Sequence, residues 1–133
     1  MKDMPSKVFI VCSLLEKDEK ASINVFNSID DARTCSVKLS TRERTYRIHE
    51  KVIDYVFEDS PIYVMKETNY VYLVYYAIPG NRDVVFHAFN NEDAAKACYK
   101  FYDERIYGPV FLEKHEILSH FTEDIIIKEK DNG

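Results

Sequence analysis

The sequence predicts an α+β fold in which a ββαββ unit is duplicated in tandem. The two units would form a mostly antiparallel sheet, or two packed sheets, with two main helices and pseudo-twofold symmetry. The first supporting observation is internal similarity, because the ungapped shift that places Val8 on Val71 aligns identical residues at 11 positions. The second is that these matches fall where a strand, a helix start and a helix face need them. The identical pairs are Val8/Val71, Val11/Val74, Phe26/Phe89, Asn27/Asn90, Asp30/Asp93, Ala32/Ala95, Cys35/Cys98, Arg42/Arg105, Glu50/Glu113, Lys51/Lys114 and Ile62/Ile125.

Each unit begins with a hairpin. Residues 7–15 are apolar and rich in β-branched side chains, and after a polar break at 16–20 the chain alternates apolar and polar residues over 21–25. Such alternation is typical of a strand with one inward face. In the second unit, residues 70–78 and 84–89 repeat the pattern around a Pro-Gly-Asn segment, whose residue types favour a turn.

A helix follows each hairpin and begins near residue 28 in the first unit and residue 91 in the second. Asn27 and Asn90 can accept hydrogen bonds from the first backbone amides of these helices, and acidic residues in the first turn suit the helix dipole. A Gly-Pro pair ends the second helix. Apolar residues at positions i, i+3 and i+7 place one stripe of each helix against a core. These stripes are Ala32, Cys35 and Leu39, and Ala95, Cys98 and Tyr102.

Two strands complete each unit, so that its order becomes hairpin, helix, strand, strand. The longer strands are predicted at 47–57 and 110–120, and shorter apolar runs predict strands at 62–66 and 125–129. The tail at 130–133 is expected to fray.

On this basis the chain divides into a first unit at 1–68 and a second unit at 69–129. No Gly/Ser-rich linker separates them, so we expect one compact domain with a shared core. A single ferredoxin-like or other α+β domain without duplicated ancestry would use nearly the same elements. The two alternatives differ in symmetry, because only duplication predicts halves that superimpose about a pseudo-twofold axis.

Composition and charge exclude several classes of protein. With 46% hydrophobic residues, 31% charged residues and 3 glycines in 133 residues, the chain is neither collagen-like nor disordered. A net charge of −5 has the wrong sign for a general nucleic-acid binder. The three cysteines lie in apolar contexts, and the N-terminal region resembles neither a membrane span nor a cleavable signal, so we expect a cytoplasmic protein with reduced thiols. The residue bias indicates an AT-rich genome, such as that of a low-GC microbe, a virus or a phage.

The sequence carries no signature of catalysis, of a metal site or of a cofactor site. The segment from His115 to His120 departs from the H-E-x-x-H pattern, and residues five apart on a strand point to opposite faces. Local sequence places no histidine to activate a cysteine, and there is no G-x-S-x-G and no Gly-rich phosphate loop. The prediction is therefore a protein that is not an enzyme and that holds no metal or cofactor.

The coverage of the sheet points to a partner. The first strand of each unit is apolar on both faces, as in strands that are buried on both sides. A helix about 10 Å across covers roughly two strands spaced about 4.8 Å apart, so two helices cannot cover both faces of the predicted sheet. The uncovered aromatic face or strand edge would then bind another protein, although a core in which Tyr replaces Phe is the alternative. The residues of this predicted aromatic face are Phe9, Tyr70, Tyr72 and Tyr76.

Arg42 and Arg105 recur near the ends of the two helices, where a cation suits the helix dipole. Pairing with a glutamate of the same unit, Glu50 or Glu113, is the structural explanation. The functional explanation is a pair of contacts for a partner or an anionic ligand.

The leading hypothesis from the sequence is a non-enzymatic protein-protein interaction or regulatory module. A homodimer is compatible with it, and a viral or phage accessory protein of this kind would inhibit a host component. Neither nucleic acid nor a membrane is expected as a partner. The alternative is a small-molecule or nucleotide sensor that binds between the two repeat units, with Arg42 and Arg105 as anion contacts.

Overall fold

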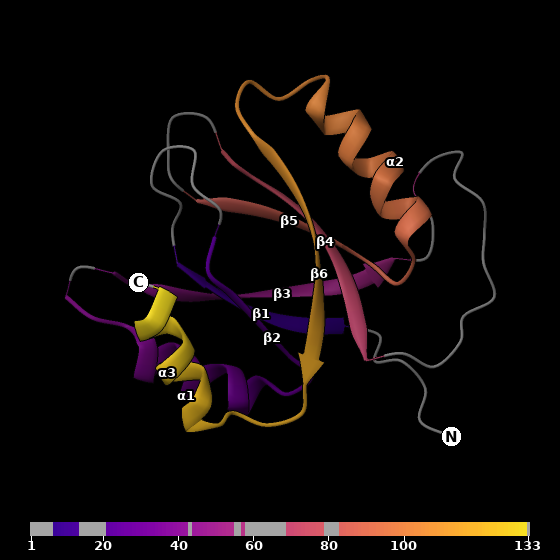
Figure 1. Ribbon diagram of the computed structural model, residues 1–133. Coiled ribbons are helices and arrows are strands. Elements are labelled where there is room, and N and C mark those ends of the chain that lie inside the picture. The colour runs from indigo at the N-terminus through magenta and orange to yellow at the C-terminus, as the bar shows by residue number, and fades with distance from the viewer. Residues whose placement is uncertain are drawn as a thin grey trace.

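The computed structural model describes residues 7–13, 21–42, 44–54, 57, 69–78 and 83–132. Within these residues, six strands close into one mixed barrel and three helices lie outside it (Figure 1). None of these described helices is long and apolar enough to cross a membrane. The elements in chain order are β1 (Lys7–Ser13), β2 (Ile23–Phe26), α1 (Ile29–Leu39), β3 (Tyr46–Asp54), β4 (Tyr70–Ala77), β5 (Val84–Phe89), α2 (Glu92–Asp103), β6 (Val110–Leu118) and α3 (Glu123–Asn132).

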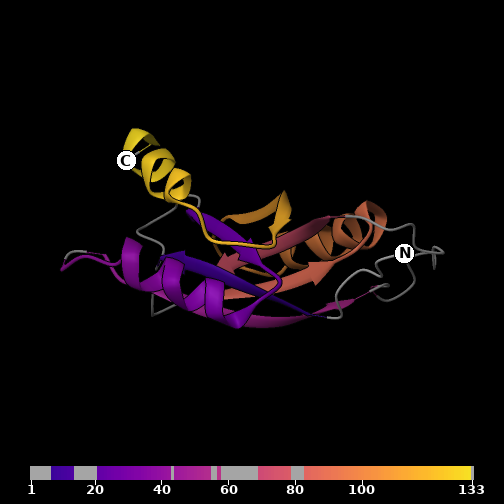
Figure 2. The same ribbon diagram turned by 90° about the horizontal axis from the view of Figure 1, so that it is seen from below.

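The barrel consists of two three-stranded antiparallel sheets. In the first sheet β1 pairs with β2 and β3, and in the second β4 pairs with β5 and β6. Two parallel junctions, β2 with β6 and β3 with β5, close the barrel in the order β1-β2-β6-β4-β5-β3. Helix α1 packs on the first sheet and α2 on the second, while α3 lies near α1 and apart from α2, as Figure 1 and Figure 2 show.

The predicted open or two-layered antiparallel sheet with two main helices was wrong, because the strands close into a mixed barrel and a third helix is present. Closure has a physical reason, since each sheet has an apolar inner face and exposed edges, and joining the edges removes both liabilities. The strand predicted at 62–66 lies outside the described residues. The strand predicted at 125–129 was wrong, because these residues belong to α3.

The hairpins and helices of the two halves correspond under the shift found in the sequence. Phe9 faces Phe26 across the first hairpin, and Tyr72 faces Phe89 across the second. The same shift superimposes the first residues of α1 and α2. Whether the halves are copies of one unit, as the division after residue 68 assumes, stays a prediction.

The last strands of the two halves correspond only when the second is moved along by one further position. Val8 pairs with Lys51, and Val71 pairs with His115 rather than with Lys114. The additional residue lies in α2, which has 12 residues where α1 has 11, because the segments that connect each helix to the following strand are equally long. The ungapped sequence comparison therefore misaligns β3 and β6 by one position and puts their inward-facing side chains out of step.

Among the residues that the structure describes, three apolar clusters form the core. One fills the barrel interior, one lies beneath α1 and α3, and one lies beneath α2. The cysteines are buried thiols, with Cys12 inside the barrel and Cys35 and Cys98 beneath the helices. Because both faces of β1 and β4 are covered in this way, their apolar character on both alternating faces is explained without a partner.

Each helix begins one residue later than predicted, and its cap residue moves by one position as well. Asn91 rather than Asn90 caps α2, since its Oδ1 accepts a hydrogen bond from the backbone amide of Ala94 at 2.8 Å. Asn90 is buried, and its Oδ1 accepts a hydrogen bond from the side-chain Nδ2 of Asn91 at 3.0 Å. At α1 the cap position is held by Ser28, whose side chain makes no capping hydrogen bond.

Helix α3 is held on the barrel by one apolar face. Ile125 is 7% exposed and belongs to the cluster beneath α1, whereas Ile127 is 55% exposed. The backbone amide of Phe121, just before the helix, donates to Asp31 Oδ1 of α1 at 2.9 Å. Residues two apart in a helix lie about 200° apart around its axis, whereas in a strand they share a face.

We predict that Ile125→Ala lowers the free energy of unfolding by roughly 2–5 kcal/mol, because it removes a buried side chain and leaves a cavity. The matched control, Ile127→Ala, changes an exposed side chain of the same kind and should shift stability by less than about 0.5 kcal/mol. Urea unfolding curves measure both values. Equal losses in the two variants would show that residues 125 and 127 share a face, as in a strand, and would contradict the helix.

Candidate functional site

The two junctions that close the barrel are short. Among the described residues each contains two residue pairs, and a backbone hydrogen bond follows each junction. Within the described residues, β6 has no strand partner over 110–116 on the side that faces residues 21–24. We call this gap the β2/β6 seam. Residues 46–52 of β3 likewise have no described strand partner on the side of 84–87, and we call this gap the β3/β5 seam. The junction pairs are Val25/Ile117 and Phe26/Leu118, and Ile53/Ala88 and Asp54/Phe89.

Ionisable side chains of β3 and β6 face the barrel interior along these seams. Residues that pair directly across antiparallel strands share one face of the sheet. Glu113 and His115 pair with Leu73 and Val71, which are fully buried in the interior cluster. The corresponding interior positions of β3 are Arg47, His49 and Lys51, which pair with the interior residues Cys12, Ile10 and Val8.

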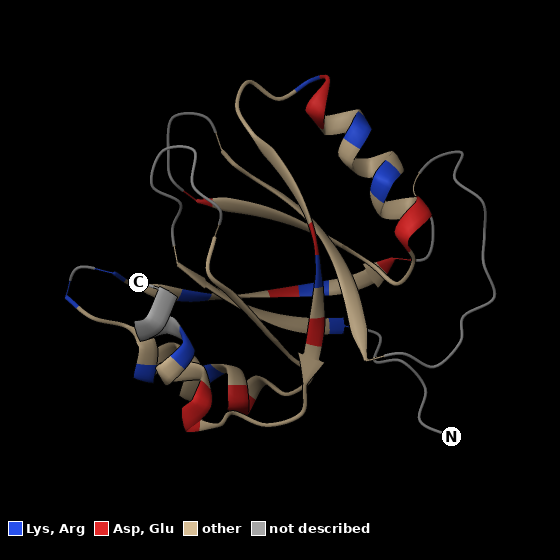
Figure 3. Cartoon of the chain, in the orientation of Figure 1, with Lys and Arg blue, Asp and Glu red and all other residues tan. Residues whose placement is uncertain are grey.

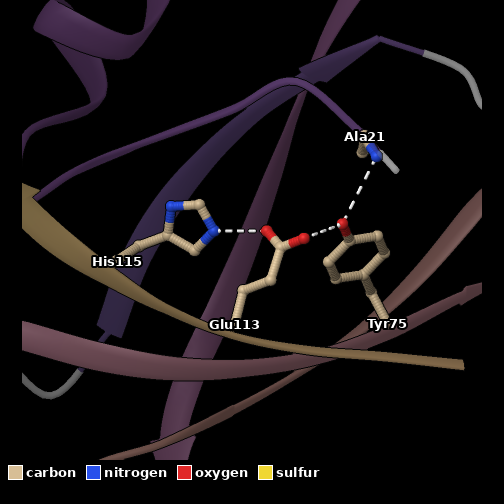
Figure 4. A network of polar contacts seen from close by, with 4 residues as sticks. All are labelled: Ala21, Tyr75, Glu113 and His115. Carbon is tan, nitrogen blue, oxygen red and sulfur yellow. Dashed lines mark hydrogen bonds and ion pairs between the residues drawn. The ribbon is translucent and has the colours of Figure 1, made fainter. Parts of the chain in front are cut away.

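A hydrogen-bonded network occupies the β2/β6 seam (Figure 4). Tyr75 Oη donates to Glu113 Oε2 at 2.6 Å and accepts from the backbone amide of Ala21 at 3.3 Å. The second carboxylate oxygen of Glu113, Oε1, lies 2.7 Å from His115 Nε2. Because Ala21 shortly precedes β2 while the other residues belong to β4 and β6, the network links the two sheets.

Aromatic packing and burial hold Tyr75 in place. Its ring is fully buried and lies between Phe111 and Phe86, at centroid distances of 5.1 and 5.4 Å. Burial raises the pKa of Tyr75 far above its ordinary value, and the hydrogen bond to Glu113 raises it further. Tyr75 therefore remains a neutral hydrogen-bond donor to the carboxylate at physiological pH.

The β3/β5 seam is lined mainly by cations. Arg47 Nη1 lies 3.9 Å from Asp83 Oδ2, and the Arg47 side chain remains half exposed. The His49 ring meets Phe86 edge to face at a centroid distance of 5.0 Å. Burial lowers the pKa of His49, and although Asp83 opposes this effect, the charges of Lys51 and Arg47 add to it. The seam thus combines a neutral imidazole with two permanent cations. Figure 3 shows charged residues of both signs on β3 and β6, and mostly uncharged residues on the other strands.

Cys12 faces the same interior but is chemically quiet. Its side chain is 1% exposed, and Sγ contacts the backbone oxygen of Ser13 at 2.9 Å. Burial, together with the carboxylates of Asp83 and Glu113, raises the pKa of Cys12 to about 12. The thiol is therefore protonated at neutral pH, and a thiol in that state is a poor nucleophile.

The predicted aromatic face is divided between the core and the surface. Phe9 is 7% exposed beneath α1, and Tyr76 is 9% exposed beneath α2. Tyr70 is 42% exposed, and Tyr72 is half-buried beside it on the outer face of β4. The Nζ of Lys114 lies 4.4 Å from the ring centroid of Tyr70 and 5.9 Å from that of Tyr72. We call Tyr70, Tyr72 and Lys114 the Tyr70 patch.

The two arginines predicted as anion contacts do not converge. Arg42 is exposed just after α1, and Arg105 follows α2 on a different side of the barrel (Figure 1). Arg105 Nη1 donates to the backbone oxygen of Phe101 at 2.8 Å, and its guanidinium lies 3.7 Å from the Phe101 ring centroid. Its acidic neighbour is Glu104 at 3.7 Å, whereas Glu113 belongs to the network in the β2/β6 seam.

Sequence reasoning missed the inward-facing residues of β3 and β6. A usable signal was present, because polar residues recur at every second position at Arg47, His49 and Lys51. Such alternation ordinarily marks the solvent face of a half-buried strand. Here Tyr46 and Ile48, on either side of Arg47, pack beneath α1, and closure of the barrel turns the polar face inward.

Comparisons with family models, with curated proteins and with solved structures found no match for the chain. Among the described residues, no group of three or more His, Cys, Asp or Glu is arranged to hold a metal ion. A functional interpretation therefore depends on the two seams and on the Tyr70 patch.

His87 lies outside the barrel, beneath α2. Its ring stacks on Tyr102 at a centroid distance of 4.8 Å and contacts Tyr76 at 6.2 Å. Burial lowers the pKa of His87, and the charge of Lys51 lowers it further. The folded chain therefore favours the neutral form of His87.

We predict that the free energy of unfolding falls as the pH drops below about 6.5, the ordinary pKa of histidine, and that His87→Phe weakens this dependence. A histidine whose pKa is lower in the folded chain binds protons preferentially after unfolding, so acid favours the unfolded state. Phe keeps the aromatic stack and removes the titrating ring. Urea unfolding at several pH values measures the dependence, and an unchanged pH profile in the variant would contradict the prediction.

Proposed function

We propose that the chain is a non-enzymatic binding protein that takes a small anionic molecule at the β3/β5 seam, between the two sheets. The observation that carries this proposal is the row of Arg47, His49 and Lys51 on the inward face of β3. A small closed barrel is normally filled by apolar side chains, and ionisable groups inside it lose hydration. Such groups are concentrated at functional sites more often than elsewhere.

The chemistry of the seam favours an anion. An arginine guanidinium binds carboxylate and phosphate groups through paired hydrogen bonds, and a lysine adds a point charge. Asp83 lies close to Arg47 and offsets part of this charge. A bound anion would pair with the charges of Arg47 and Lys51, and it would favour the protonated form of His49. Phosphate-bearing and polycarboxylate molecules are therefore the ligand classes to test first.

The thiol of Cys12 supports binding rather than covalent catalysis. It faces the interior, but its raised pKa leaves it protonated at neutral pH. The tyrosine hydroxyl in the neighbouring seam is likewise neutral and is engaged with Glu113.

We predict that ATP, inorganic phosphate or citrate raises the melting temperature of the wild-type protein and that Arg47→Ala removes this rise. A ligand present at about 100 times its Kd adds about 2.7 kcal/mol to the free energy of unfolding. The matched control is Arg42→Ala, because Arg42 is an exposed arginine outside the seam. This variant should retain the full ligand-dependent rise in differential scanning fluorimetry.

A second variant guards against a simple loss of folding in Arg47→Ala. Asp83→Asn keeps the arginine and removes the carboxylate near it, so it should tighten anion binding. No rise with any of the three anions, or an undiminished rise in Arg47→Ala, would refute the anion site.

The Tyr70 patch favours a second candidate function, the binding of a protein partner. This patch is the part of the predicted aromatic face that α2 leaves accessible, since Tyr70 is 42% exposed. A large aromatic ring with a hydroxyl and a neighbouring cation is typical of interface residues. A second copy of the chain is the partner to test first, because a homodimer would place the patch against an identical one.

If the patch mediates self-association, Tyr70→Ala should weaken the dimer at least about tenfold, the loss expected for truncating a central interface residue. Tyr107→Ala is the matched control, because Tyr107 is 99% exposed and lies between α2 and β6. Sedimentation equilibrium over a range of concentrations measures the association. A wild-type protein that remains monomeric throughout would exclude the homodimer.

A further inference from the structure

The β2/β6 seam is held by side chains where the strand ladder is absent. The ladder between β2 and β6 stops after two residue pairs at one end of the strands. Toward the other end, the contact between the sheets passes from Ala21 to Tyr75 and on to Glu113 (Figure 4). The Tyr75 hydroxyl uses both its donor and its acceptor capacity in this path.

The two seams are closed in different ways. The β3/β5 seam is bridged by the Arg47–Asp83 pair at 3.9 Å and by the ring contact of His49 with Phe86. The β2/β6 seam is crossed instead by the hydrogen bond from the Ala21 amide to the Tyr75 hydroxyl, which Glu113 of the same sheet as Tyr75 holds in place. Breaking the bonds of Tyr75 would therefore remove the hydrogen bond that crosses this seam, while the apolar junction pairs remain.

We propose that the Tyr75–Glu113–His115 network is a latch on the barrel, and that its release lets the start of β2 separate from β6 and exposes the interior. Local opening of this kind needs a segment with few paired strands and few buried contacts. The start of β2 fits, because Ala21 and Ile23 are only partly buried. Such a latch would control access to the barrel interior.

Cys12 is placed to report the opening. It pairs with Ile23 across β1 and β2, so movement of Ile23 away from β6 uncovers the thiol. Cys35 and Cys98 are 0% exposed beneath α1 and α2, outside the barrel. Modification of Cys12 therefore reports opening of the barrel interior, whereas modification of Cys35 or Cys98 reports opening beneath α1 or α2 in the same molecule.

The test is the rate at which a thiol reagent modifies each cysteine under native conditions, resolved by peptide mass spectrometry. Tyr75→Phe removes the hydroxyl and keeps the ring, and it should raise the modification rate of Cys12 by at least about tenfold, as loss of hydrogen bonds to a carboxylate predicts. Rates at Cys35 and Cys98 should change less than about threefold. Glu113→Gln keeps an acceptor for Tyr75 but removes the charge, so it should raise the Cys12 rate by a smaller factor.

Tyr76→Phe is the matched control, because Tyr76 is a buried tyrosine on the outer face of the same strand. It should leave the Cys12 rate within about threefold of the wild type. A parallel rise at all three cysteines in Tyr75→Phe would mean general destabilisation and would overturn the latch, as would an unchanged Cys12 rate. The measurement uses no ligand, so its outcome is independent of the anion site.

Discussion

Closure of the barrel by two short parallel junctions is the constraint on which the rest of the structure depends. Each three-stranded sheet has one inward apolar face, and neither sheet can bury that face alone. Edge-to-edge joining buries both faces, but each junction supplies two residue pairs. The long strands β3 and β6 therefore extend past their parallel neighbours, and side chains must complete the contact between the sheets along the two seams.

The same closure changes where function is expected. An open sheet would leave an aromatic face waiting for a partner, whereas in the barrel Phe9 and Tyr76 are core residues beneath helices. The first sheet is covered by α1 with the help of α3, and the second by α2. Of the predicted aromatic face, Tyr70 and the half-buried Tyr72 remain accessible in the small Tyr70 patch. The unusual chemistry lies inside the barrel, on the inward faces of β3 and β6.

Local pattern predicted the hairpins and the first two helices, because alternation and the i, i+3, i+7 stripe act within single elements. Closure of the barrel could not be predicted from the sequence, because the side chains of a strand alternate with the same period in a barrel as in an open sheet. Ile125, Ile126 and Ile127 form a run that fits a strand or a helix equally well, and only packing beneath α1 selects the helix. The inward direction of Arg47 and Lys51 could not be predicted, because it depends on a partner sheet that is distant in sequence.

The two seams have equivalent positions but different chemistry, and this difference follows from single substitutions. When the hairpins and the last strands are each aligned by their pairing, Cys12 corresponds to Tyr75 and His49 corresponds to Glu113. The Tyr75 hydroxyl is held by Glu113 of the same sheet and reaches the backbone of Ala21 in the other sheet, whereas the corresponding Cys12 carries no group that reaches as far. The β3/β5 seam is left with cations that no interior carboxylate of its own strand neutralises. One barrel geometry thereby provides a hydrogen-bonded seam on one side and a basic seam on the other, which is why we propose binding at one edge of the interior and opening at the other.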